Sequence, residues 1–288
     1  MHFVKPHFKK FLHLVGGCLG AAGVLFVAVR LHRYADQIAA DRFSLSQWFF
    51  IALLAFIYGS ANVLLATAWS RILVFLQLRA GRDWAVQAYG VSQLAKYVPG
   101  NVFQFAGRQA MGLAAGLAAG PLLRSTGYEL GMLAAAGAFF GLLALPLWTA
   151  GVPEWAALLI FCACVAAIAQ VLRRHVSRHL AAAWGFQLLF LALSGVVFWL
   201  VLAMVSAQWD LPLASICGAY VLSWLLGLAT PGAPAGVGVR EAALLFMLGA
   251  SVQPSHLLFA VVIGRIVTVC GDLLFFCACV LRKRHLHQ

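Results

Sequence analysis

Two arginines occupy matching places in two widely separated segments of the chain. Arg108 lies nine residues after Pro99-Gly100, and Arg240 lies nine residues after Pro231-Gly232. A guanidinium group binds phosphate through two parallel hydrogen bonds, and the N-terminus of a helix after each turn adds a favourable dipole. We therefore expect both arginines to converge on one phosphate. In the structural alternative, each arginine caps carbonyl groups of its own segment, or Arg240 pairs with Glu241.

Four further charged residues lie in apolar surroundings, where insertion of a charge into a membrane costs roughly 2.5–3.5 kcal/mol. Lys96 precedes the first Pro-Gly pair and is expected to be a second contact for the anion. Arg265 and Asp272 are seven residues apart, so they share one face of a helix. Together with Glu241 they are expected to form a coupling network, in which Asp272 takes up a proton, or a structural ion network.

The candidate site combines these charges with their polar and glycine-rich neighbours. No nucleophile, nucleotide-binding or metal-binding motif stands out, so we expect no catalytic residue, cofactor or metal. The substrate-binding candidates are Arg108, Arg240, Lys96, Asn101 and Gln104; the coupling or ion-network candidates are Glu241, Arg265 and Asp272; the hairpin-tip candidates are Pro99, Gly100, Pro231, Gly232, Gly236 and Gly238.

The composition excludes an ordinary soluble protein. Hydrophobic residues make up 64% of the 288 residues and charged residues only 10%, whereas soluble domains contain roughly 45–50% and about 25%. Disorder is also excluded because it requires low hydrophobicity. The net charge of +12 comes from short clusters between apolar runs, which is typical of cytoplasmic loops and not of a nucleic-acid-binding face. The chain is therefore predicted to be a polytopic membrane protein.

Six apolar segments are long enough to cross a bilayer, whose core of ~30 Å needs about 20 helical residues. Two more regions, 84–123 and 214–250, are each interrupted by a Pro-Gly pair, so their halves are too short to cross. The predicted fold is therefore all-α, with six full transmembrane helices and two re-entrant hairpins. The predicted spans are 11–29, 47–69, 127–148, 153–172, 181–205 and 256–281.

The distribution of basic residues predicts the orientation. With the N-terminus inside, the inner segments hold thirteen lysines and arginines and the outer loops hold three. The positive-inside rule therefore places both termini in the cytoplasm.

The single membrane domain, residues 1–288, contains an internal repeat. A shift of 132 residues places Pro99-Gly100 on Pro231-Gly232 and Arg108 on Arg240, and it also aligns 47–69 with 179–201. Each half, 1–150 and 151–288, has two spans, one hairpin and one span. Because three crossings is an odd number, the second half is expected to enter the membrane inverted, as in many transporters.

The segments QLAKYVPGNVFQFAGR, residues 93–108, and TPGAPAGVGVRE, residues 230–241, resemble the flippase-like transmembrane family of lysylphosphatidylglycerol synthases. The resemblance implies a bacterial or archaeal cytoplasmic-membrane protein that moves a lipid between leaflets. It implies an anionic phospholipid or a sugar linked to polyprenyl phosphate as the substrate, with envelope glycosyltransferases as partners of stand-alone members. The chain ends at Gln288 without the aminoacyl-transferase domain of the synthases, so aminoacyl transfer is not implied.

Two other functions remain open. The chain could be a membrane-embedded glycosyl- or phosphotransferase that uses Asp36 and Asp41 of the first outer loop, or a non-transporting subunit of an envelope glycosylation system. The sequence does not define the headgroup, the energy source or the oligomeric state.

Overall fold

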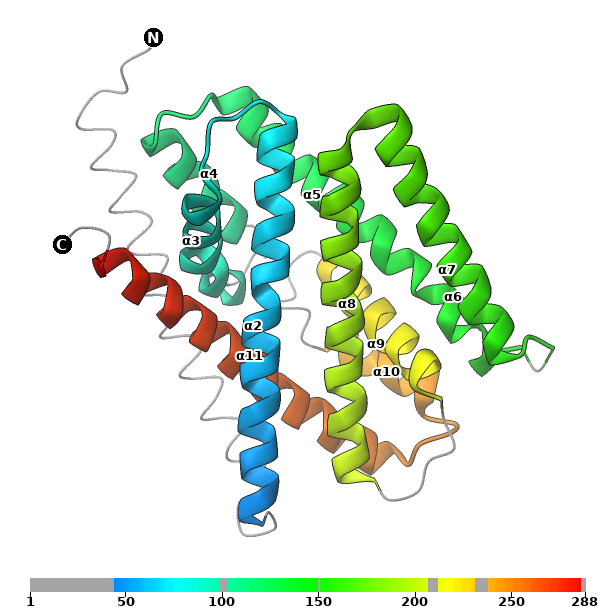
Figure 1. The fold of residues 1–288 in the computed structure, drawn as a ribbon. Coiled ribbons are helices and arrows are strands. Elements are labelled where there is room, and N and C mark those ends of the chain that lie inside the picture. Colours follow the sequence, from blue (N-terminus) through cyan, green and yellow to red (C-terminus); the bar gives the residue numbers. More distant parts are fainter. Residues whose placement is uncertain (1–43, 99–102, 150, 207–211, 231–237, 286–288) are drawn as a thin grey trace.

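The computed structural model describes residues 44–98, 103–149, 151–206, 212–230 and 238–285. Within these segments the chain is helical and contains no strand (Figure 1). Five helices are long and apolar enough to cross a membrane: Leu45–Phe75, Ala119–Leu147, Glu154–Val176, Arg178–Val205 and Pro254–Arg282. The all-α class is thus confirmed for this part of the chain, and five predicted spans correspond to such helices. The sixth, 11–29, lies outside the described residues.

The most extensive interface between two helices joins α2 (Leu45–Phe75) and α8 (Arg178–Val205). These helices lie side by side and run in opposite directions (Figure 1). Ser44 begins α2 with a reciprocal cap, in which its hydroxyl accepts from the Gln47 N–H and the Gln47 amide oxygen accepts from the Ser44 N–H. Large side chains fill the interior, and Trp69 and Trp184 are fully enclosed. α11 (Pro254–His285) crosses behind α2 and packs against both helices.

Two glycines determine how closely α2 and α11 approach. A Cβ on Gly59 would lie 2.7 Å from the Gly271 carbonyl oxygen, and a Cβ on Gly271 would lie 2.7 Å from the Ala55 carbonyl oxygen. Small residues at such crossings let two backbones come into direct contact, a common device in membrane proteins. The same contact places the middle of α11 beside the middle of α2.

The outermost helix supports the assignment to a membrane. α7 (Glu154–Val171) continues into a short π-helix, η4 (Leu172–Val176), and only Ala157 of α7 is buried. Phe161, Val165 and Ile168 pack against the bundle. Many of the other apolar side chains of α7 point outward, with Trp155 67% and Leu159 62% exposed. A helix that is apolar on every side needs either a protein core or lipid around it. The helix therefore requires a lipid environment.

Four helices are too short to cross a membrane. α3 (Arg82–Gln93) and α4 (Phe103–Ala114) are joined through the 3₁₀ helix η2 (Leu94–Tyr97), and α9 (Leu213–Ala229) is followed by α10 (Val239–Leu248). At 1.5 Å per residue, α3 and α4 each extend for only about 18 Å. The pair α3/α4 occupies the upper half of Figure 1 and α9/α10 the lower half. The predicted tips at 99–102 and 231–237 lie outside the described residues.

One predicted boundary is wrong. The first interrupted region was expected to extend to residue 123 and the next span to begin at residue 127, but α4 ends at Ala114 and α5 (Ala119–Phe139) begins at Ala119. Gly116, with φ +82°, ends α4 because the left-handed conformation costs glycine little. Arg124 is exposed, so helix can form around it without burying the charge. α5 then continues through a break at Phe140 into α6 (Gly141–Ala144) and η3 (Leu145–Leu147).

Candidate functional site

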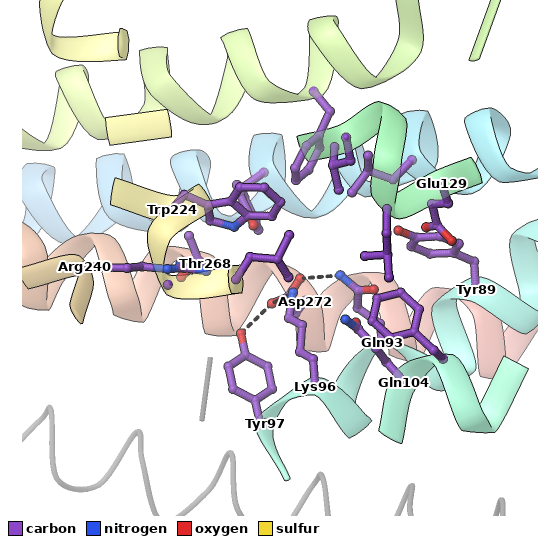
Figure 2. Close-up of a pocket in the computed structure, with 18 of the residues that line it drawn as sticks. Tyr89, Gln93, Lys96, Tyr97, Gln104, Glu129, Trp224, Arg240, Thr268 and Asp272 are labelled. Carbon is purple, nitrogen blue, oxygen red and sulfur yellow. Dashed lines mark hydrogen bonds and ion pairs between the residues drawn. The ribbon is translucent and has the colours of Figure 1, made fainter. Parts of the chain in front are cut away.

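A polar cavity lies at the centre of the bundle, between the two pairs of short helices (Figure 2). About 780 Å³ of this region is not occupied by protein atoms, and part of that space is open to the outside. Its walls come from both halves of the chain, since α2, α3, η2, α4 and α5 contribute on one side and α8, α9, α10 and α11 on the other. The polar residues that line it are Tyr58, Tyr89, Gln93, Lys96, Tyr97, Gln104, Glu129, Arg240, Arg265, Thr268 and Asp272.

Asp272, in the middle of α11, is fully buried and accepts hydrogen bonds from several groups. The Asn62 and Gln93 amides donate to Oδ1 at 3.1 and 3.2 Å. The Tyr97 hydroxyl donates to Oδ2, and Lys96 Nζ lies 2.7 Å from the same oxygen. In Figure 2 the Tyr97 hydroxyl and the Gln93 amide point toward this carboxylate. With one ion partner and three neutral donors, Asp272 is well satisfied as a carboxylate, which can only accept.

The Asp272 cluster links three parts of the chain. Gln93 donates to both Asp272 and Asn62 Oδ1, the latter at 3.0 Å, so α2, the end of α3 and α11 share one hydrogen-bond network. Lys96 is 20% exposed at its side chain and lines the cavity, whereas Asp272 is 0% exposed. Both residues line the cavity, and Lys96 is the more accessible member of the pair. It was expected to contact an anion directly, but in this conformation it is the ion partner of Asp272.

Arg108 on α4 is enclosed by protein. Its Nη1 lies 2.8 Å from Glu129 Oε2, and both side chains are only 3% exposed. Three aromatic rings surround the guanidinium, with centroids 5.1 Å away for Trp69, 4.3 Å for Tyr89 and 5.1 Å for Phe105. Cation–π contacts of this kind and a buried carboxylate together satisfy the charge. Arg108 is not among the residues that line the cavity.

Glu241 on α10 pairs with α11 and not with its neighbour Arg240. Its Oε1 accepts from Arg265 Nη2 at 2.9 Å and from Arg265 Nε at 3.2 Å. Its Oε2 accepts from the Gly238 N–H at 2.7 Å, which caps the N-terminus of α10. Gly238 has φ +86°, so glycine suits this position. The alternative in which Arg240 pairs with Glu241 is therefore wrong.

Arg240 is the cation that faces the cavity without an acidic partner among the described residues. Its guanidinium lies over the Trp224 ring at 5.8 Å, and its buried Nε has no hydrogen-bond partner in this part of the chain. An unpaired buried donor on a charged group is costly, by about 1–3 kcal/mol or more. The arrangement is therefore suited to an anion that enters the cavity and accepts these hydrogen bonds.

The structure changes the predicted site in two respects. The shared site of Arg108 and Arg240 is replaced by a single cavity-facing arginine, because Glu129 already neutralises Arg108. The predicted network of Arg265 and Asp272 is divided between different ion partners, Glu241 for the arginine and Lys96 for the acid. Gln104, which was predicted to bind the substrate, lines the cavity. Pro99, Gly100, Asn101, Pro231, Gly232 and Gly236 lie outside the described residues.

Sequence reasoning overlooked three polar residues. Asn62 and Gln93 hold Asp272, and Glu129 holds Arg108. Glu129 is buried within α5. The signal that could have identified Asn62 was its amide in the middle of an apolar span, where a buried polar group needs a partner.

The described residues contain no group of three or more His, Cys, Asp or Glu side chains that could hold a metal ion. No protein-family model matches the chain, and no curated protein is similar enough to it to indicate a relationship.

Proposed function

We propose that this chain is a multi-pass membrane protein that moves an anionic lipid, either a phospholipid or a sugar linked to polyprenyl phosphate, between the two leaflets. The observation that carries the proposal is Arg240, a guanidinium without an acidic partner among the described residues, at a polar cavity inside an apolar bundle. A charge is expensive within a membrane unless it serves a ligand or a partner. A lipid phosphate supplies the missing negative charge and accepts bidentate hydrogen bonds.

The contacts between helices support an inverted repeat. The order long, short, short, long occurs twice, as α2, α3, α4, α5 and as α8, α9, α10, α11. An inverted repeat predicts that the contact between α3 and α11 has a counterpart in a contact between α9 and α5 or α6. Both contacts are present. Each is close at a glycine, since Gly90 of α3 lies beside Cys279 of α11 and Gly218 of α9 lies beside Phe140. The equivalent helices α2 and α8 run in opposite directions (Figure 1). Inverted repeats with short helices around a central site suit alternating access.

The ends of the helices support an orientation with the upper end of Figure 1 in the cytoplasm. The α2–α3 and α4–α5 connections and the start of α8 lie at that end. The basic residues in these segments or in the adjoining helix ends are Arg71, Arg79, Arg82, Arg124, Arg173, Arg174 and Arg178. The described residues that join the helices at the lower end include no lysine or arginine. The positive-inside rule then favours a cytoplasmic C-terminus, because Arg282 of α11 pairs with Asp83 of α3.

The resemblance to the flippase-like family favours the same function and a bacterial or archaeal cytoplasmic membrane. The rival transferase depends on Asp36 and Asp41, which lie outside the described residues. The rival role as a partner subunit needs a partner that the described residues do not identify. Neither alternative is favoured by a specific observation, whereas the cavity and Arg240 favour lipid transport.

The test is lipid translocation by purified protein in liposomes. A fluorescent phosphatidylglycerol is placed in both leaflets, and the fraction that a membrane-impermeant quencher reaches over time gives the rate. Removing a charged hydrogen-bond partner from a dry site costs about 2–5 kcal/mol. Arg240→Ala should therefore lower lipid affinity roughly 30-fold or more, at ~1.4 kcal/mol per decade. Arg240→Lys should retain part of it, because lysine offers a point charge without the planar fork.

Arg282→Ala is the matched control, since Arg282 is also an arginine of the bundle but its side chain is 63% exposed and remote from the cavity. It should translocate lipid at the normal rate. If Arg240→Ala inserts stably and both binds and moves the lipid as the unmodified protein does, the proposal is wrong. It is also wrong if the unmodified protein neither binds the lipid nor accelerates its movement relative to empty liposomes.

A further inference from the structure

Among the described residues, the charged groups around the cavity are balanced except for one. Three ion pairs account for three carboxylates and three cations: Lys96 with Asp272 at 2.7 Å, Arg108 with Glu129 at 2.8 Å, and Arg265 with Glu241 at 2.9 Å. Arg240 lines the same cavity and has no carboxylate partner in the described segments. The set as a whole therefore carries one excess positive charge.

This balance disfavours a headgroup that carries an ammonium group. Each carboxylate of the set already holds a cation at hydrogen-bond distance, so none of the three is left to neutralise a second positive charge. An ammonium group would enter a cavity lined by Lys96, Arg240 and Arg265. Like charges in a region of low dielectric repel strongly. In a zwitterionic lipid, the unfavourable repulsion of the ammonium group would therefore offset the favourable interaction between the phosphate and Arg240.

The same balance disfavours a headgroup with two or more negative charges. A second cation would have to come from Lys96 or Arg265, which also line the cavity. Lys96 is the more accessible of the two to supply it, since its side chain is 20% exposed against 9% for Arg265. To do so it must leave Asp272, whose carboxylate is 0% exposed and would keep only the neutral donors of Asn62, Gln93 and Tyr97. Breaking a buried pair and leaving its charge behind is strongly unfavourable.

Neutral polar groups complete the lining. Tyr58 and Gln104 line the cavity, and neither side chain makes a hydrogen bond to another described residue. A hydroxyl and an amide both donate and accept. They can therefore bind the hydroxyl groups of a glycerol or a sugar beside the phosphate.

We infer that the cavity selects a phosphodiester with a single net negative charge and a neutral, hydroxylated headgroup, in preference to zwitterionic and to multiply charged headgroups. This inference rests on the proposed function, which it makes more specific. The Lys96–Asp272 pair discriminates between singly and multiply charged headgroups, because Asp272 holds Lys96 and so prevents it from binding a second negative charge. The pair thus acts as a positioning element for selectivity, while Arg240 makes the contact with the phosphate.

The experiment measures equilibrium binding of three radiolabelled lipids to the purified protein in mixed micelles. Phosphatidylglycerol is the phosphodiester with one charge, phosphatidylethanolamine is the zwitterion, and diacylglycerol pyrophosphate carries at least two charges. We expect phosphatidylglycerol to bind about tenfold more tightly than either of the others, the effect of one unsatisfied charged group. Soluble glycerophosphoglycerol forms a separate arm. Displacement of the lipid by this compound at similar concentration would overturn the assignment of a lipid, since it would indicate a soluble phosphodiester as the ligand.

Asp272→Asn tests the mechanism of selectivity. The substitution removes the charge that holds Lys96, so the set gains a second unpaired cation and the preference should shift about tenfold toward the pyrophosphate lipid. Asp83→Asn is the matched control, because it makes the same chemical change in the exposed Asp83–Arg282 pair outside the cavity. It should leave the preference of the unmodified protein unchanged.

The outcomes separate this inference from the proposed function. If none of the three lipids binds the unmodified protein, the proposed function fails and the inference fails with it. If phosphatidylglycerol binds but the zwitterionic or pyrophosphate lipid binds equally well, only the inference is overturned. The unmodified protein decides this point even if Asp272→Asn does not insert stably. If Asp272→Asn inserts and keeps the original preference, the role of the Lys96–Asp272 pair is wrong.

Discussion

Glu241 Oε1 lies 2.9 Å from Arg265 Nη2, so the carboxylate that directly follows Arg240 in the sequence is held by the neighbouring helix α11. Successive residues on a helix point about 100° apart, which follows from 3.6 residues per turn. Glu241 therefore faces α11 while Arg240 faces the cavity and Trp224. Because Glu241 pairs with Arg265, it does not neutralise Arg240, and the Arg240 guanidinium remains available to an anion in the cavity.

Substitution of Glu241 should show this dependence. In Glu241→Gln the side-chain oxygen can still accept from the Gly238 N–H, but the charge that balances Arg265 is lost. Because the Glu241 side chain is 23% exposed, we expect a moderate loss of about 1–3 kcal/mol in the free energy of unfolding. Thermal unfolding in detergent, followed by circular dichroism, measures this loss. An unchanged melting temperature would contradict the assigned role of the ion pair.

The Arg108–Glu129 pair should behave as a structural unit. Glu129→Ala leaves the guanidinium without its carboxylate in a site that is only 3% exposed, which should cost about 3–5 kcal/mol. The double variant Arg108→Met/Glu129→Leu replaces both charges by apolar groups and should recover most of that loss, because neither partner is then left uncompensated. Unfolding measurements on the single and double variants give the coupling energy.

Lipid binding by the same variants distinguishes the two roles of Arg108. The double variant should still bind phosphatidylglycerol, since it leaves the net charge around the cavity unchanged. If it folds stably and loses binding, the Arg108–Glu129 pair contributes to ligand binding and not only to stability.

The spans could be predicted from sequence because hydropathy over about 20 residues is a local property. The two interruptions were also visible, because proline and glycine change the backbone where they occur. Which charges would remain unpaired could not be predicted. Arg108 and Arg240 occupy equivalent positions, but the partner of Arg108 is Glu129, and the residue 132 positions further on is Val261. An acid on a distant helix thus makes the two arginines different.

The hydrogen-bond network around Asp272 could not be predicted from the sequence for a related reason. Asp272 itself was recognisable as a charge in an apolar helix, but Asn62 and Gln93 are neutral and have little effect on the hydropathy of their segments. Their importance arises from the crossing of α2 and α11, where Asn62 Nδ2 comes within 3.1 Å of Asp272 Oδ1. That crossing depends on a backbone contact between glycines, which sequence spacing alone does not identify.

The crossing of α2 and α11 at Gly59 and Gly271 should tolerate no added side chain. A Cβ at Gly59 would lie 2.7 Å from a backbone oxygen of α11, which cannot move aside as a flexible side chain can. We expect Gly59→Ala to separate the helices and lower stability by about 1–3 kcal/mol, as overpacking does. Gly131→Ala is the control, because Gly131 lies within α5 and a Cβ there meets nothing within 4 Å. It should leave stability unchanged or raise it by up to about 1 kcal/mol. Equal melting temperatures for the two variants would show that the crossing is not tightly packed.

The orientation of the bundle should place its basic end in the cytoplasm. His175 in η4 is exposed at the basic end, and Thr149, between η3 and α7, is exposed at the other. Single cysteines at these positions, in a background without the native cysteines, can be treated with a membrane-impermeant thiol reagent in intact cells. The excess of arginines at one end predicts that Thr149→Cys is modified and His175→Cys is protected until the cells are opened. Because the two positions lie at opposite ends of the same bundle, they must respond oppositely. Modification of His175→Cys alone in intact cells would reverse the topology and place both termini outside.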